Sequence, residues 1–205
     1  MWGFRDDTGA PVYVVKNGLD KEGCAKVIEG LKDKTHVASH HDGEKLVSTE
    51  DGPRNSSVLF FQDLELKNSL NNWVNVANHS TGLRYDIVDS EMLQFTKYDS
   101  KDKQYYGWHI DSGVVRTDHP ARKLSLTLQL SDENEYEGGD LEFDFRDTDK
   151  GSQPRICEEI RKKGSVIVFP SFVWHRVRPV KKGSRDSLVL SLIHISEPTR
   201  LLSMA

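Results

Sequence analysis

The sequence predicts a mainly β protein of the α+β class, in which N-terminal helices buttress a double-sheet jelly roll. Apolar residues follow helical spacing only in the segment before Gly82, whereas short strand-like segments succeed one another from Glu91 onward. In addition, the leucines from Leu124 to Leu130 alternate strictly with polar residues, which is the pattern of a strand with one buried face. Helices followed by many short strands suggest a double-sheet jelly roll that the helices buttress.

Two helices are expected in the N-terminal part of the chain. The first is capped by Asp20, and the second ends near Gly82. Residues 36–57, between the two helices, are polar and rich in turn-forming residues, which predicts a loop. The apolar residues that define the helical faces are Cys24, Val27, Ile28 and Leu31 in the first helix and Leu66, Leu70, Trp73, Val74 and Ala77 in the second.

The strands expected after Glu91 are short and are separated by Gly, Pro, Ser or charged turns. Residues 133–139, ENEYEGG, are expected to form a turn between two of them. The predicted strands lie within MLQFTKY (92–98), QYYGWHID (104–111), RKLSLTLQLS (122–131), DLEFDF (140–145), GSVIVFP (164–170), FVWHRV (172–177) and DSLVLSLIHI (186–195).

The length of 205 residues suits a single domain. With 28 basic and 32 acidic residues the net charge is −4, so no broad basic surface for nucleic acid is expected. No apolar run approaches the roughly 20 residues that span a bilayer, so no membrane partner is expected either. The N-terminus lacks the pattern of a secretory signal, and Cys24 and Cys157 lack metal-type spacing. These features favour a reducing, cytoplasmic location.

The C-terminal segment LSLIHISEPTR, Leu190 to Arg200, resembles the translated sequence of a common sequencing adapter. On this interpretation residues 1–189 form the domain, and residues 190–205 are a foreign tail. The alternative is a native final strand, since Leu188, Leu190 and Leu192 alternate with other residues. Both interpretations allow a strand to form there.

His109 and Asp111 are candidate metal ligands, because residues two apart on a strand point to the same face. The spacing alone is weak, since about one such pattern is expected by chance; His40 and Asp42 repeat it within the predicted loop. His175, on a later predicted strand, is the candidate for a third ligand. Two histidines and one carboxylate on one face, with open positions beside them, are typical of non-haem iron(II) oxygenases.

Arg185 is the candidate anchor for 2-oxoglutarate, the co-substrate of the commonest enzymes of this kind. It follows His175 on the next predicted strand, and its planar guanidinium suits a carboxylate. Ser187 lies on the same face of that strand and adds a hydroxyl group.

The segments YYGWHID, RKLSLTLQLSDENEYEGGDLEF and GSVIVFPSFVWHRVRPVKKGSRDSLV together resemble the iron(II)- and 2-oxoglutarate-dependent dioxygenases of the prolyl-4-hydroxylase-like branch. The resemblance covers roughly residues 54–189. It implies a double-stranded β-helix fold, iron(II) held by His109, Asp111 and His175, and 2-oxoglutarate held by Arg185. It also implies O2 as a co-substrate, with ascorbate as a further candidate cofactor.

Further pocket residues follow from the same resemblance. Tyr98, Thr127 and Gln129 match positions that line the co-substrate pocket in the family. One departure concerns position 191, which is Ser here, whereas many relatives have a tryptophan about six residues after the arginine. This difference falls inside the suspected foreign tail.

Four residues are candidates for a substrate pocket, and three of them have a simpler explanation. The two tryptophans among them lie beside the proposed histidines and are equally typical of an ordinary core. The arginine lies in the predicted loop, where a surface position is the alternative. The four residues are Tyr106, Trp108, Trp174 and Arg54.

The function that the resemblance implies is hydroxylation of an unactivated C–H bond, foremost in a prolyl or other residue of a peptide or protein. A small-molecule substrate stays open at this point. Two other functions are compatible with a jelly roll. One is a metal-dependent cupin-type enzyme that does not use 2-oxoglutarate, and the other is a non-catalytic binding module.

Overall fold

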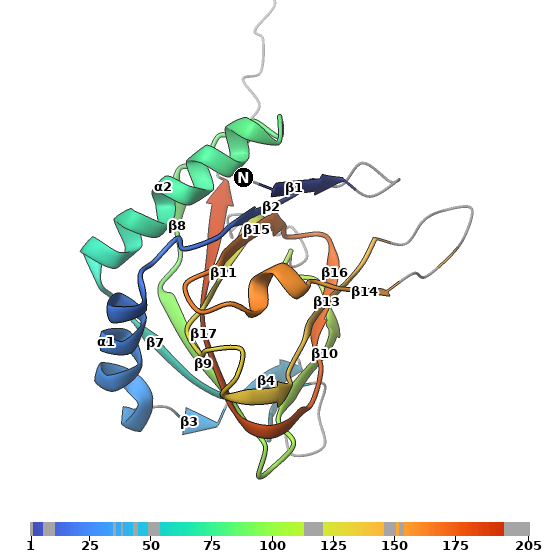
Figure 1. The fold of residues 1–205 in the computed structure, drawn as a ribbon. Helices are drawn as coiled ribbons and strands as arrows, with labels where there is room; N and C mark the ends of the chain where they lie inside the picture. Colours follow the sequence, from blue (N-terminus) through green and yellow to red (C-terminus); the bar gives the residue numbers. More distant parts are fainter. Residues whose placement is uncertain are drawn as a thin grey trace, which may run out of the picture.

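The computed structural model describes residues 2–5, 11–34, 36–37, 39–42, 45–48, 54–112, 121–145, 151 and 154–194. Two β-sheets face each other, and two helices cover the outer face of the larger sheet (Figure 1). This arrangement is the double-stranded β-helix, or jelly roll, that the sequence predicts. None of the helices in the described part of the chain has the length and apolar character that crossing a bilayer requires.

Each helix begins where an aspartate accepts a backbone hydrogen bond. Asp20 Oδ1 accepts from the backbone N–H of Gly23, and Asp63 Oδ1 accepts from that of Leu66. The helices are α1 (Lys21–Leu31), which is followed by a 3-10 turn (Lys32–Lys34), and α2 (Leu64–Ser80). Both predicted helices are therefore confirmed, with the second starting two residues before Leu66.

The larger sheet contains most of the strands. Its central strand is β17 (Val180–His194), which pairs antiparallel with β11 (Ala121–Gln129) on one side and β9 (Leu93–Asp99) on the other. The path continues outward through β15 (Val166–Pro170), β2 (Pro11–Val15) and β1 (Trp2–Arg5) on the first side and through β7 (Ser57–Phe61) and β3 (His36–Val37) on the second. The short strands β8 (Asp89–Ser90) and β12 (Tyr136–Gly138) also pair with β17.

The smaller sheet lies opposite and supplies the second wall of the jelly roll (Figure 1). Its order is β14 (Pro154–Ile156), β13 (Leu141–Asp144), β16 (Trp174–Val177), β10 (Tyr105–His109) and β6 (Arg54–Asn55). A separate hairpin consists of β4 (Ser39–Asp42) and β5 (Lys45–Ser48), and a 3-10 turn spans Glu158–Arg161.

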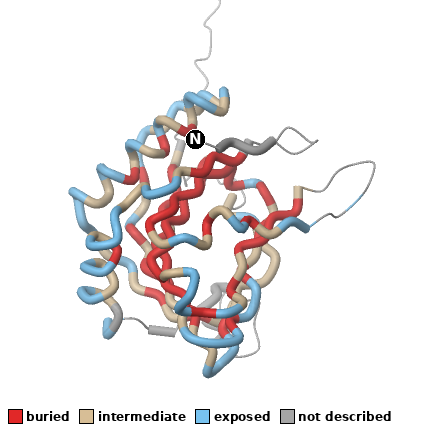
Figure 2. The backbone as a smooth tube through the Cα atoms, in the orientation of Figure 1, coloured by how far each residue is buried: buried red, intermediate tan, exposed pale blue. Residues whose placement is uncertain are grey.

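The two faces of the larger sheet have different compositions. The outward leucines of β11 and β17 pack with Leu70, Val74 and Ala77 of α2 in one hydrophobic core. Alternate residues of the same strands, among them Arg185, Ser187 and Thr127, face the smaller sheet. Figure 2 shows the buried residues concentrated in the two sheets, with exposed residues on the outer sides of the helices. The leucine alternation seen in the sequence therefore separates a core face from a polar face.

Two segments differ from the sequence-based expectation. Residues 36–57 do not form one loop, since β3, β4, β5 and β6 lie within them. The predicted turn at 133–139 contains β12, whose three residues pair with β17. In both segments polar composition hides the strands, because these strands are short and their pairing depends on distant parts of the chain.

The proposed boundary after Val189 falls inside β17. Leu190 and Leu192 are fully buried and lie opposite Leu126 and Leu124 of β11. Residues 195–205, the rest of the proposed tail, lie outside the described residues. Residues 190–194 therefore form part of a strand. The proposal that residues 190–205 are foreign concerns only the origin of this sequence.

Asp186 is a buried carboxyl group on β17 whose charge is expected to destabilise the fold at neutral pH. Burial raises the pKa of this group from 3.8 to about 6, although Lys97 nearby opposes the shift. The folded state therefore holds this proton more tightly than the unfolded state, and the resulting stabilisation is present below about pH 4 and is lost as the pH rises through 6. The effect of Asp186→Asn on the free energy of unfolding is therefore expected to be more favourable at pH 7 than at pH 4, by on the order of 2 kcal/mol. Urea unfolding of both proteins across this pH range measures the difference.

The matched control for this prediction is Asp102→Asn, which changes an exposed carboxyl group. Its effect on stability is expected to be small at every pH. A difference between Asp186→Asn and the unchanged protein that stays constant from pH 4 to pH 7 would contradict the pKa assignment.

Candidate metal and co-substrate site

Two histidines meet across the smaller sheet. His109 on β10 lies directly opposite His175 on β16, and their ring centroids are 4.1 Å apart. Asp111 follows β10 by two residues and is fixed by its backbone N–H, which donates to the carbonyl of Ser171 at 2.9 Å. Its Oδ1 is 3.6 Å from Nε2 of His109, and its Oδ2 is 3.6 Å from Nε2 of His175. One ligand atom from each of the three residues lies within 4.8 Å of the others.

Both imidazole rings are held in the same way. Nδ1 of His109 is 2.8 Å from the carbonyl oxygen of Gly107, and Nδ1 of His175 is 2.9 Å from that of Val173. When each Nδ1 carries the proton and donates it to the carbonyl, each Nε2 is left as a lone-pair donor facing Asp111. The rings are further packed, because Tyr106 stacks on His109 at 3.5 Å and Phe169 meets His175 edge-on at 4.8 Å.

The charges of the three residues suit a cation. Burial lowers the pKa of His109 from 6.5 to about 3, and His175 beside it acts in the same direction. Burial alone would raise the pKa of Asp111, but His175, His109 and a hydrogen bond from Ser125 outweigh it and hold that pKa below its ordinary value. A neutral imidazole and an ionised carboxylate are the forms that bind metals. The arrangement matches the two-histidine, one-carboxylate set that non-haem iron(II) prefers.

Ser125 positions the carboxylate. Its Oγ donates to Oδ2 of Asp111 at 2.6 Å and lies 2.9 Å from Oγ of Ser171, and both serines are fully buried. Because such supporting hydrogen bonds orient metal ligands, Ser125→Ala is expected to weaken iron(II) affinity roughly 10-fold to 100-fold. Anaerobic metal titration measures this, with Ser69→Ala, an exposed serine on α2, as the control. Equal affinity in the two variants would show that Asp111 does not need the hydroxyl.

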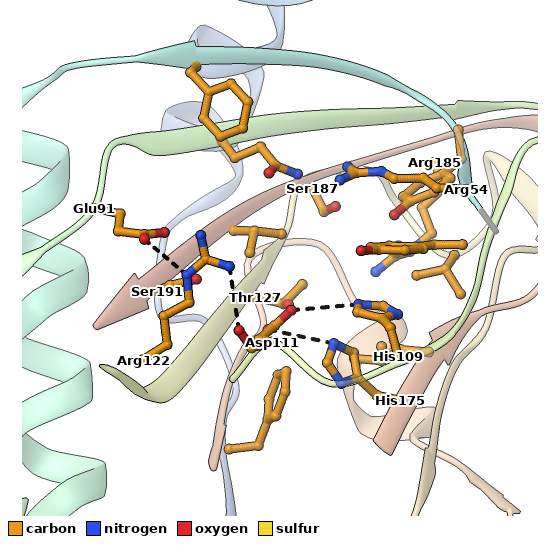
Figure 3. A pocket seen from close by; sticks show the side chains of 18 of the residues that line it. Arg54, Glu91, His109, Asp111, Arg122, Thr127, His175, Arg185, Ser187 and Ser191 are labelled. Carbon is orange, nitrogen blue, oxygen red and sulfur yellow. Dashed lines mark hydrogen bonds and ion pairs between the residues drawn. The ribbon is translucent and has the colours of Figure 1, made fainter. Parts of the chain in front are cut away.

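A cavity of about 130 Å³ lies beside the three residues, between the two sheets. Its wall combines polar residues of β9, β11 and β17 with apolar residues of the smaller sheet (Figure 3). Of the residues singled out in the sequence, it brings together His109, Asp111, His175, Arg185, Ser187, Thr127, Tyr98, Tyr106 and Arg54.

Arg185 lies at the inner part of this cavity and is 2% exposed. It pairs in the sheet with Tyr98, whose ring centroid is 5.8 Å from the guanidinium carbon. Its Nη2 atom is buried and has no hydrogen-bond partner. Gly139 makes room for the side chain, because a Cβ there would lie 3.2 Å from Cδ of Arg185. A buried guanidinium with an open N–H requires an acceptor, and a carboxylate is the acceptor that fits it best.

Three other predicted residues do not line the cavity in the described structure. Gln129 is fully buried behind it, where Nε2 donates to Tyr136 Oη and to the carbonyl of Ser131, each at 3.2 Å. Trp108 instead supports Arg176, whose guanidinium carbon is 4.6 Å from the ring centroid. Trp174 is half-buried at the start of β16. All three residues lie near the site without lining its cavity. The sequence pattern does not show which side chains of a strand reach the cavity.

Sequence reasoning missed the mouth of the cavity. Glu91 and Arg122 line it and form an ion pair at 2.9 Å, and Arg122 Nη1 also donates to the backbone carbonyl of Asp111 at 3.4 Å (Figure 3). Phe60 is 52% exposed and Met92 is 44% exposed, although both are large apolar residues. No local pattern identifies Arg122, because it has the same parity along β11 as the leucines. The register of β11 against β17 shifts between Arg122 and Leu124, and this shift belongs to the folded sheet.

Comparison with known proteins gives a consistent result. Residues 93–191 match the family model of the 2OG-Fe(II) oxygenase superfamily. A PKHD-type hydroxylase from Synechococcus sp. (strain CC9902) is 42% identical over 81 residues, which are 39% of this chain and 32% of that protein. A PKHD-type hydroxylase from Gloeothece citriformis is 36% identical over 93 residues, which are 45% of this chain and 38% of that protein. The chain thus spans about a third of the length of these curated relatives.

Solved structures share the fold. A prolyl-4-hydroxylase from Pseudomonas putida superposes with a TM-score of 0.67 at 18% identity, covering 89% of this chain and 92% of that one. A viral collagen prolyl hydroxylase from Paramecium Bursaria Chlorella virus-1, solved as a 2OG complex, gives 0.62 at 21% identity, covering 88% and 94%. A prolyl hydroxylase from Trichoplax adhaerens, in complex with a peptide fragment of the hypoxia inducible factor oxygen degradation domain, gives 0.62 at 14% identity, covering 89% and 83%.

Proposed function

Because residues 93–191 match the family model of the 2OG-Fe(II) oxygenase superfamily, we propose that this chain is an iron(II)- and 2-oxoglutarate-dependent dioxygenase that hydroxylates a C–H bond of a prolyl or other residue in a peptide or protein. The observation that supports this best is the position of a buried, unpartnered guanidinium in the same cavity as the His109, Asp111 and His175 set. A metal site alone would not need that arginine.

Iron(II) would be held by His109, Asp111 and His175. The donor set fits the metal, since two Nε2 atoms and an ionised carboxylate converge and each is fixed by a hydrogen bond of its own. When bound, iron supplies the activation of O2 that couples decarboxylation of 2-oxoglutarate to hydroxylation. The protein's part is to hold the ligands in one orientation, which the backbone carbonyls and Ser125 do.

The far carboxylate of 2-oxoglutarate would be bound by Arg185. The open Nη2 atom supplies the donor, and three hydroxyl-bearing residues, Ser187, Thr127 and Tyr98, line the same cavity. No carboxylate of the described residues forms an ion pair with Arg185, so its charge is available to a bound anion. Burial strengthens that interaction, because water does not screen it.

Another part of the cavity lining is apolar. Leu141, Phe169 and Val177 line it beside His175 and come from strands of both sheets. These side chains exclude water from the ligand set and leave room for the carbon skeleton of the co-substrate and the target residue. The peptide held by the Trichoplax adhaerens enzyme of the same fold supports a peptide as the substrate class.

The test is an anaerobic titration of the metal-free protein with iron(II) and then 2-oxoglutarate, followed by the visible absorbance band of their complex. Succinate is then measured after air is admitted in the presence of proline-containing peptides, whose mass reports the addition of oxygen. We expect a saturable band and peptide-dependent succinate. Iron binding without any band would contradict the proposal and favour a cupin-type metal enzyme. No iron binding would favour a non-catalytic jelly-roll module.

A further inference from the structure

We propose that Arg54 binds a carboxylate of the substrate, so that the target carbon is presented next to an anionic group. This inference rests on the proposed function and names a chemical property of its substrate. Arg54 lies on β6 of the smaller sheet and lines the cavity, whereas Arg185 lies on β17 of the larger sheet. The two guanidinium groups therefore come from opposite walls.

The guanidinium of Arg54 is fixed before any ligand arrives. Its Nε donates to Oγ of the fully buried Ser56 at 2.8 Å. Its carbon Cζ lies 4.6 Å from the ring centroid of Tyr106, and that ring stacks on His109 at 3.5 Å with an interplanar angle of 15°. A cation over an aromatic ring is attracted to its face. The side chain is thus held against the metal-ligand set, which is unlike a loop arginine that extends into water.

One donor of Arg54 remains open. Nη2 is buried and has no hydrogen-bond partner, and no ion pair joins this arginine to a carboxylate of the described residues. A buried N–H of a charged group is costly to leave unpaired, unless a ligand supplies the acceptor. Arg185 shows the same open Nη2. The cavity therefore offers two separate cationic donors, and the far carboxylate of one 2-oxoglutarate molecule uses only one.

The charge balance of the cavity leads to the same conclusion. Glu91 and Arg122 neutralise each other at 2.9 Å. The charges of iron(II) and 2-oxoglutarate cancel, and Asp111 balances Arg185. The positive charge of Arg54 remains. This charge lies beside the proposed ligands, since Cζ of Arg54 is 4.6 Å from the ring centroid of Tyr106, which stacks on His109. A substrate carboxylate would restore neutrality in this sheltered space.

The experiment compares two probes that differ only in charge, N-acetyl-L-proline and N-acetyl-L-prolinamide. Each is titrated anaerobically into the protein loaded with iron(II) and 2-oxoglutarate, and its dissociation constant is read from the change in the visible band. The proteins are the unchanged chain, Arg54→Gln, Arg54→Lys and the matched control Arg178→Gln, which removes an exposed arginine outside the cavity.

We expect the unchanged chain and Arg178→Gln to bind the carboxylate at least about 10-fold more tightly than the amide. Arg54→Gln should lose this preference, and Arg54→Lys should keep part of it, because a lysine retains the charge without the planar fork. A preference that persists in Arg54→Gln, or no preference in the unchanged chain, would overturn the proposal.

Two further readings separate this proposal from the proposed function. If Arg54→Gln raises the concentration of 2-oxoglutarate needed for the band as strongly as Arg185→Gln does, Arg54 binds the co-substrate and the inference is wrong. If the unchanged chain gives no band at all, the proposed function fails, and the inference fails with it.

Discussion

Replacing His175 by alanine is expected to weaken iron(II) binding by more than about 100-fold, because losing a ligand costs more than losing a residue that only supports one. His175 is 5% exposed, its ring is fixed by the carbonyl of Val173, and it lies directly opposite His109. Without it, two proposed ligands remain. At micromolar iron(II) we therefore expect neither metal binding nor the visible band of the complex with 2-oxoglutarate. Competition with a chromophoric chelator measures the affinity.

The control is His79→Ala, which removes an exposed histidine in the last turn of α2. It should bind iron(II) like the unchanged chain. Thermal unfolding of the metal-free proteins separates loss of a ligand from loss of the fold. Retention of tight iron binding by a folded His175→Ala protein would mean that the metal lies elsewhere.

Replacing Arg185 by glutamine is expected to weaken 2-oxoglutarate binding by about 100-fold or more, while iron(II) affinity changes little. Truncating one partner of a buried charge pair leaves the other charge unpaired in a site without water, which accounts for the size of the effect. Arg185→Lys should recover part of the loss, since it keeps a cation but not two parallel donors. The concentration of 2-oxoglutarate at half-maximal band intensity measures each variant.

Lys181→Gln, an exposed change earlier on the same strand, serves as the control for charge and for β17 itself. Equal loss of iron(II) and 2-oxoglutarate binding in Arg185→Gln would indicate a damaged fold. Unchanged 2-oxoglutarate binding in a folded variant would assign the anchor to another residue of the cavity.

Much of the fold could be predicted because its signals are local. The leucines of β11 alternate with polar residues, and those of β17 recur at every second position. In both strands the leucines pack in the core, and residues of the other face line the cavity. Asp20 and Asp63 cap the helices through hydrogen bonds to residues only three positions later in the sequence. The strands within residues 36–57 could not be predicted, because β3 and β6 depend on pairing with β7 and β10, and nothing in their own residues requires it.

The candidate site was partly predictable for a similar reason. The spacing of His109 and Asp111 shows that they share a face, but no local pattern shows that His175 lies opposite His109, because register between strands is a property of the folded sheet. Gln129 has the same parity as Thr127, yet it lies beyond the end of the cavity and bonds to Tyr136. Parity along a strand gives the face of a residue but not its depth.

Arg54 is a cavity residue whose local sequence predicts a different environment. Its surroundings in the sequence are Gly, Pro, Asn and Ser, which indicate a loop. The structure places it on an edge strand against Tyr106, a contact between residues 52 positions apart in the numbering, 54 and 106. Only the tertiary arrangement reveals that the side chain enters the cavity.

The division of the larger sheet into a leucine face and a polar face has an evolutionary consequence. Leu188 stabilises the fold, whereas Ser187 and Val189, its immediate neighbours in β17, line the cavity. Mutations at Ser187 and Val189 can alter what the cavity accepts without removing contacts from the core beneath α2. A lineage built on this sheet can therefore diversify its chemistry at alternate positions of one strand while purifying selection holds the positions between them constant.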